Sequence, residues 1–111
     1  MRYVVLYRPV SGTLADLERE RPDLLHAHIA HLGELYRQGQ VLLGGPFGGQ
    51  GAAEAAPVGM AVFEAGGLEE VRDSLQRDPL WASDRATTEI YPWHTIFDAL
   101  AAHKPLAEQT R

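Results

Sequence analysis

Residues 22–47, PDLLHAHIAHLGELYRQGQVLLGGPF, carry the signals that decide the fold of this chain. Apolar residues recur every three or four positions, which is typical of an amphipathic helix, and they form two neighbouring rows. The first row is Leu25, Ile29, Leu32 and Tyr36, and the second row is Leu24, His28, His31 and Leu35. Pro22 suits the first helical position, and Gly39 suits the position just after a helix. We therefore predict a helix over residues 22–38 with both rows facing inward, followed by a strand over residues 40–45.

The flanking segments add three strands and one helix. The predicted strands cover residues 3–7, 40–45, 58–64 and 86–93, and the predicted helices cover residues 22–38 and 68–77. The two strands on either side of the glycine-rich loop at residues 48–57 should pair antiparallel. Pro92 indicates either that the last strand lies at an edge of the sheet or that the strand ends there. Residues 13–21 are expected to form only a short helical turn or loop, and residues 80–85 a connector.

This order of elements predicts an α+β, ferredoxin-like βαββαβ fold, in which a four-stranded antiparallel sheet carries both helices on one face. The strands are apolar at both parities, since Val4 and Leu6 alternate with Tyr3 and Val5. Two helices can cover only one face of the sheet, so the other face would expose an apolar patch that calls for a partner. A second copy related by a twofold axis is the simplest partner, and a homodimer is expected.

Length and composition exclude several classes of protein. The chain has 111 residues, enough for one compact domain, and a formal net charge of -5 without a basic stripe. This charge argues against nucleic acid and anionic membranes as partners. The lack of cysteine excludes disulfides, thiolate metal sites and a cysteine nucleophile. No segment approaches the length of a membrane span or has the pattern of a signal peptide, so a cytoplasmic location is expected.

His28 is the residue most suited to chemistry, because it lies among leucines on the face of the helix that should be buried. A buried imidazole is costly unless its nitrogens find partners. One interpretation is a core histidine bonded to a backbone carbonyl; the other is a general base or acid, which neutral imidazole can be near pH 7. Asp78 is the candidate partner that would orient the ring, although Asp-Pro is also a common helix stop. No serine or cysteine is placed as a nucleophile, which favours proton transfer over acyl transfer.

Several other residues could contact a ligand. The glycines before Pro46 would allow a close approach of a ligand to the backbone, although a tight turn that needs glycine geometry is the favoured explanation. No helix follows them, so they do not form a phosphate-binding loop. The candidate ligand-contacting residues are Tyr7, Gly45, Pro46, Phe47 and Trp81. Contacts in the core or in a dimer interface would explain the aromatic residues among them equally well. His31 lies one turn from His28, a spacing that can bind a metal, but without a third matched ligand no metal and no cofactor is expected.

The ordered set of motifs resembles the YCII-related family, which belongs to the dimeric α+β barrel superfamily. The residues that carry the resemblance are Arg21-Pro22, His28, Gly39, Gly44-Gly45-Pro46 and Asp78-Pro79. The resemblance covers about residues 1–97 and leaves residues 98–111 as a C-terminal extension. It implies a ferredoxin-like protomer that dimerises through its sheet, with a pocket between sheet and helices and with His28 and Asp78 as the active-site pair.

The function that the resemblance implies is that of a small-molecule enzyme. One characterised type of member eliminates hydrogen chloride from a chlorinated hydroquinone, and relatives in the wider superfamily act on small aromatic or lactone-like compounds. The expectation for this chain is a cofactor-free lyase or isomerase in which His28 moves a proton and Asp78 holds the ring. The alternative is a non-catalytic, small-ligand-binding or accessory dimer that uses the same pocket.

Overall fold

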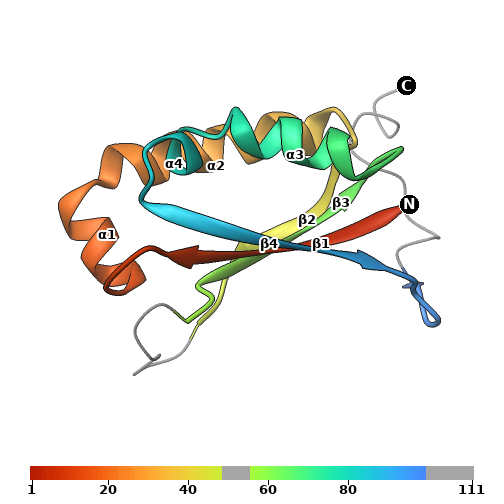
Figure 1. Cartoon of the computed structure of the whole chain (residues 1–111), viewed down its shortest axis with the longest axis horizontal. Coiled ribbons are helices and arrows are strands. Elements are labelled where there is room, and N and C mark those ends of the chain that lie inside the picture. Colours follow the sequence, from red (N-terminus) through yellow and green to blue (C-terminus); the bar gives the residue numbers. More distant parts are fainter. Residues whose placement is uncertain (49–55, 100–111) are drawn as a thin grey trace.

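The computed structural model describes residues 1–48 and 56–99, and it confirms the predicted ferredoxin-like fold. The strands are β1 (Arg2–Pro9), β2 (Val41–Pro46), β3 (Gly59–Glu64) and β4 (Ala86–Trp93), and the helices are α1 (Leu14–Glu20), α2 (Pro22–Arg37), α3 (Leu68–Gln76) and α4 (Pro79–Ala82). The strands pair antiparallel in the order β2-β3-β1-β4. Helices α2, α3 and α4 lie over one face of the sheet, and α1 lies where β1 ends (Figure 1). Strand β1 is therefore central, and β4 with its Pro92 is an edge strand, which is one of the two predicted alternatives.

Two segments, residues 13–21 and residues 80–85, contain more helix than was predicted from the sequence. Within residues 13–21, Leu14–Glu20 form the helix α1, because the side chain of its N-cap Thr13 accepts a hydrogen bond from the Asp16 N–H, while Asp16 accepts one from the Thr13 N–H at 3.0 Å. This reciprocal capping box satisfies two N–H groups that a helix start leaves unpaired. The predicted connector at residues 80–85 likewise begins within the short helix α4. Neither segment shows a long apolar periodicity, which is why pattern alone missed them.

The core lies between the sheet and helices α2 and α3. Every second residue of β1 is buried, which places Tyr3, Val5 and Tyr7 on the face toward the helices. They pack with Phe63 of β3 and Leu35 of α2. A second, smaller cluster joins α1, α2, α4 and the start of β4. Its buried members are Leu17, Leu24, Leu80 and Ala86.

The two rows of α2 do not share one environment, which corrects the prediction that both face inward. Leu24 and Leu35 of the second row are buried. In the first row Ile29 is 65% exposed and Tyr36 is 41% exposed. The sheet offers few side-chain atoms for this row to pack against. The strand register places Gly44 on the face of the sheet toward the helices, and glycine has no side chain there.

Among the described residues no helix lies over the other face of the sheet (Figure 1), which is apolar at its middle and carries the ion pairs Arg8–Glu89 and Arg2–Glu64 toward its ends. Val4, Leu6 and Met60 are only partly buried there, and Tyr91 opposite Val4 is exposed. The predictions for the loop at residues 48–57 and for the C-terminal extension fall largely on residues 49–55 and 100–111, outside the described part of the chain. Within the described part, no helix has the length and apolar character needed to cross a membrane.

Candidate active site

His28 and Asp78 are in direct contact. The Nδ1 atom of His28, in the middle of α2, lies 2.5 Å from Oδ2 of Asp78. The Asp78 side chain is 1% exposed and the His28 side chain 14%. A carboxylate this deeply buried must be paired, and an ionised carboxylate can only accept hydrogen bonds. We therefore assign the proton to Nδ1, which leaves Nε2 as the unprotonated nitrogen of the neutral ring.

The local sequence around Asp78 explains its position. Helix α3 ends at Gln76, and the residue before Pro79 is held in extended backbone, as Asp78 is with φ -74° and ψ 122°. Asp78 is thereby the N-cap of α4, and its Oδ1 accepts a hydrogen bond from the Leu80 N–H at 3.0 Å. One carboxylate oxygen thus fixes the aspartate to its own helix, and the other orients the imidazole of His28.

Tyr7 completes the polar part of the site. Its ring meets the His28 ring edge to face, with centroids 5.0 Å apart and planes at 70°. Its hydroxyl is buried and has no hydrogen-bond partner among the described residues. Burial raises the pKa of Tyr7, and the negative charge of Asp78 raises it further. The hydroxyl therefore stays protonated near neutral pH and can donate a hydrogen bond to an oxygen or nitrogen of a ligand.

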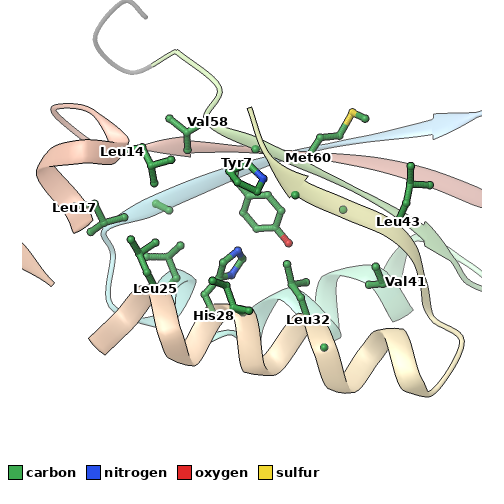
Figure 2. A pocket seen from close by; sticks show the side chains of 18 of the residues that line it. Tyr7, Leu14, Leu17, Leu25, His28, Leu32, Val41, Leu43, Val58 and Met60 are labelled. Atoms are coloured by element: carbon green, nitrogen blue, oxygen red, sulfur yellow. The ribbon is translucent and has the colours of Figure 1, made fainter. Parts of the chain in front are cut away.

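A cavity of about 620 Å³ is lined by Tyr7 and His28, while Asp78 lies behind the His28 ring and does not border it. Figure 2 shows His28 and Tyr7 midway along it, with Leu14, Leu17 and Leu25 on one side. We call this side, lined by those three leucines, the α1 arm. On the other side Leu32 and Val41 line what we call the β2 arm. The volume lies within the range of about 300–1,000 Å³ that is usual for small-molecule sites.

The cavity exists because the sheet carries little side-chain volume opposite the first row of α2. Pro46, Gly59 and Tyr7 are neighbours across the strands, as are Gly44, Ala61 and Val5. A Cβ atom on Gly44 would lie 3.2 Å from the Cβ of Ala61, so that position admits a side chain only with rearrangement. The lining also includes Gly45, Leu43 and Met60, which the register places on the opposite face, so the cavity continues round the edge strand β2.

The predicted ligand-contacting residues divide into two groups. Tyr7, Gly45 and Pro46 line the cavity. Phe47 lies just beyond the end of β2 with its side chain exposed, and Trp81 lies in α4; neither borders the cavity. Sequence reasoning missed the α1 arm, although the Thr13–Asp16 capping box was a signal that a helix carrying Leu14 and Leu17 begins there.

His31 has a different environment from His28. Its Nε2 lies 2.8 Å from the backbone carbonyl oxygen of Ser74 and donates to it, which joins α2 to the last turn of α3. Within residues 1–48 and 56–99, no group of three or more metal-ligating side chains is arranged to hold an ion. The arrangement that was considered for His28, a ring bonded to a main-chain carbonyl, is thus the one found for His31.

These features define a class of protein: a ferredoxin-like domain in which an imidazole, held by a buried carboxylate, borders a cavity between sheet and helix. The chain belongs to the YCII-related family, whose domain profile matches residues 1–94. No curated protein matches the sequence.

Among solved structures, the fold is similar to that of 5-chloro-2-hydroxyhydroquinone dehydrochlorinase (TftG) from Burkholderia phenoliruptrix AC1100, in complex with 2,5-dihydroxybenzoquinone. The TM-score is 0.63 and the sequence identity 23%, over 85% of this chain and 94% of that chain. A likeness at this identity shows a common fold and no more.

Proposed function

We propose that the protein is a cofactor-free enzyme, a lyase or isomerase, in which His28 transfers a proton to or from a small, largely apolar compound. The observation that carries the proposal is the 2.5 Å contact between His28 and the buried Asp78 at the wall of a cavity. A solvent-exposed pair would not imply chemistry, but a buried carboxylate is retained at an energetic cost, and such groups cluster at functional sites.

The chemistry follows from the assigned tautomer. Nε2 of His28 has no hydrogen-bond partner in the described part of the chain, so it is available to take a proton from an acidic O–H or C–H of the ligand. The imidazolium that forms is stabilised by Asp78 through Nδ1. The proton then returns to a different atom of the ligand in an isomerisation, or stays on the ring while a leaving group departs in an elimination.

The structural relative supports the choice of compound class. That protein is named as a dehydrochlorinase of a chlorinated hydroquinone, and its structure holds a dihydroxybenzoquinone. A mostly apolar cavity with a base in its wall suits phenols, lactones and halogenated diols, in which one acidic group is attached to an apolar body.

The experiment is a turnover assay of wild type, His28→Ala and His26→Ala on a panel of these three compound classes. His26 lies two residues earlier on the same helix with its side chain exposed, so it controls for the loss of an imidazole. We expect His28→Ala to lose at least about 100-fold in turnover, since general bases typically contribute 10²–10⁴, and His26→Ala to be unchanged. Equal turnover by all three proteins would overturn the proposal.

A ligand-binding protein without turnover is the second candidate. It is favoured by the wall itself, because apolar side chains line both arms and would hold a ligand with or without a proton transfer. Binding of a panel compound that survives His28→Ala, with turnover absent in wild type, would select this function.

We further propose that the protein is a homodimer through the apolar face of the sheet. Val4, Leu6 and Met60 are partly exposed there beside Tyr91, an arrangement that a second copy would bury. Sedimentation should give a dimer for wild type and a monomer for Val4→Arg. Ala30→Arg, at an exposed position of α2, should remain a dimer. A monomeric wild type at micromolar concentration would contradict this proposal.

A further inference from the structure

The polar groups of the cavity that are shielded from solvent lie at its middle rather than at one end. Of the residues that line it, only Tyr7, Glu18, His28 and Tyr36 carry a polar nitrogen or oxygen in the side chain. Glu18 and Tyr36 are exposed. His28 and Tyr7 face each other between the α1 arm and the β2 arm (Figure 2). A ligand that fills the cavity therefore has apolar atoms on both sides of the point where it meets the imidazole.

The size of the cavity points the same way. An apolar cavity of about 150 Å³ already accommodates benzene, so a single ring would leave most of this space empty. The 620 Å³ found here include the part that continues round β2. The two arms lie on the helix side of the sheet, so they stay open even where a partner covers the opposite face.

Resting on the proposed function, we propose that the natural ligand is an elongated, largely apolar molecule whose acidic group lies near the middle of its length. One apolar end occupies the α1 arm, and the other occupies the β2 arm. The acidic O–H or C–H thereby meets Nε2 of His28 from within the cavity. Compounds of one ring, or compounds whose acidic group is terminal, leave one arm unfilled and bind more weakly.

Two isomeric phenols provide the probes. In 2-benzylphenol the hydroxyl lies beside the junction of the two rings, and in 4-benzylphenol it lies at one end; phenol itself is the truncated reference. Their dissociation constants are measured by titration calorimetry with the intact protein. We expect 2-benzylphenol to bind at least about tenfold tighter than phenol, because a tenfold change corresponds to about 1.4 kcal/mol and a second ring buries enough apolar surface for that. We expect a similar advantage over 4-benzylphenol, because its terminal hydroxyl can meet His28 only if one arm stays unfilled.

Substitutions that fill one arm at a time locate the two ends. Gly33 borders the β2 arm, and a Cβ there would meet only Arg37, at 3.9 Å, so Gly33→Leu can be accommodated. Leu14→Trp fills the α1 arm from its rim. Each variant should weaken 2-benzylphenol about tenfold and phenol less than about twofold. Ala30→Leu, at an exposed position one turn before Gly33 that does not line the cavity, is the matched control and should change neither.

The outcomes separate this inference from the proposed function. Equal affinity for the two isomers, or unchanged binding of 2-benzylphenol by both filled variants, would overturn the elongated ligand. Neither result touches the role of His28, which the turnover assay decides. Conversely, full turnover by His28→Ala would remove the proton transfer and leave the shape of the ligand standing.

Discussion

The two rows of helix α2 have the same spacing and a similar apolar content, yet they are packed to different degrees: in the first row Leu25 and Leu32 are only partly buried against the core clusters. The row of Leu24 and Leu35 lies against the other helices and the core, and these two residues are buried. The row of Ile29 and Tyr36 borders the cavity, and these two side chains are 65% and 41% exposed. The difference arises on the sheet, which presents glycine where the cavity lies. An apolar row therefore marks either a packed face or a ligand-binding wall, and the opposing residues decide which.

The two histidines of the second row, His28 and His31, likewise differ in what they contact. His31 donates to the Ser74 carbonyl, an arrangement with a structural role. His28 instead meets a buried carboxylate and borders the cavity. Because they lie one turn apart on the same helix, substitutions at each and at their partners test whether position alone separates chemistry from support.

The largest effect is expected for Asp78→Asn. The amide oxygen can still cap α4 by accepting from the Leu80 N–H, so the fold should persist. The amide nitrogen, however, would donate to Nδ1 of His28 and place the proton on Nε2, which removes the base. We expect turnover to fall by about 10²- to 10⁴-fold with less change in ligand affinity. Steady-state kinetics and calorimetry measure the two quantities, and wild-type turnover in this variant would show that Asp78 does not orient the ring.

The second prediction compares the two rows directly through stability. Leu35→Ala removes a buried side chain from the core and should lower the free energy of unfolding by about 3 kcal/mol. Ile29→Ala, at the exposed rim of the cavity, should lower it by less than about 0.5 kcal/mol. Urea denaturation gives both values. Equal losses would mean that the first row is packed in solution, and that the cavity is closed.

The strands and the two main helices could be predicted because their signals are local. Gly39 has φ +82°, the left-handed conformation expected of a residue just past a helix, and Pro92 lies in an edge strand. Even the contact between His28 and Asp78 could be anticipated, from an imidazole among leucines, an Asp-Pro helix stop and the family resemblance. Its catalytic role stays a proposal.

The family resemblance implied a pocket between sheet and helices, but the lining of the cavity could not be predicted, because it depends on which residues face one another across the fold. That Gly44 lies toward the helices follows from the register of β2 with β3, and this register shifts at a bulge between Val41 and Leu43. A shift by one residue exchanges the two faces of a strand, and no short-range pattern reports it. The α1 arm was missed for a related reason, since Leu14 and Leu17 lie in a short polar segment whose helix depends on its cap.

A smaller effect is expected for His31→Leu, which removes the hydrogen bond between α2 and the end of α3. The free energy of unfolding should fall by about 1 kcal/mol, because the Ser74 carbonyl loses its donor. Turnover should fall far less than in Asp78→Asn, since His31 supports the aspartate only through α3. His26→Leu, on the exposed side of α2, is the control. A loss of turnover as large as that of Asp78→Asn would place His31 in the reaction itself.

The smallest effect at neutral pH concerns Tyr7→Phe. The hydroxyl is buried without a partner in the described part of the chain, so its removal should raise the free energy of unfolding by about 1 kcal/mol. Affinity for an oxygen-bearing ligand such as 2-benzylphenol should fall at the same time, if the hydroxyl meets that oxygen. If the variant gained stability and bound the ligand with unchanged affinity, Tyr7 would line the cavity without forming a hydrogen bond to the ligand.

High pH sharpens this last prediction, because the pKa of Tyr7 is raised in the folded protein by burial and by Asp78. An unfolded tyrosine ionises near pH 10, whereas the folded one keeps its proton. Tyr7 therefore adds no pH dependence below about pH 10, and above it the wild type should lose up to about 1.4 kcal/mol of stability per pH unit relative to Tyr7→Phe. Tyr91, whose pKa a hydrogen bond to Glu89 also raises, titrates in both proteins and cancels in the difference. If the two stability curves stayed parallel up to pH 11, the Tyr7 hydroxyl would be open to solvent. The middle of the cavity, where Tyr7 lies, would then be open to solvent as well.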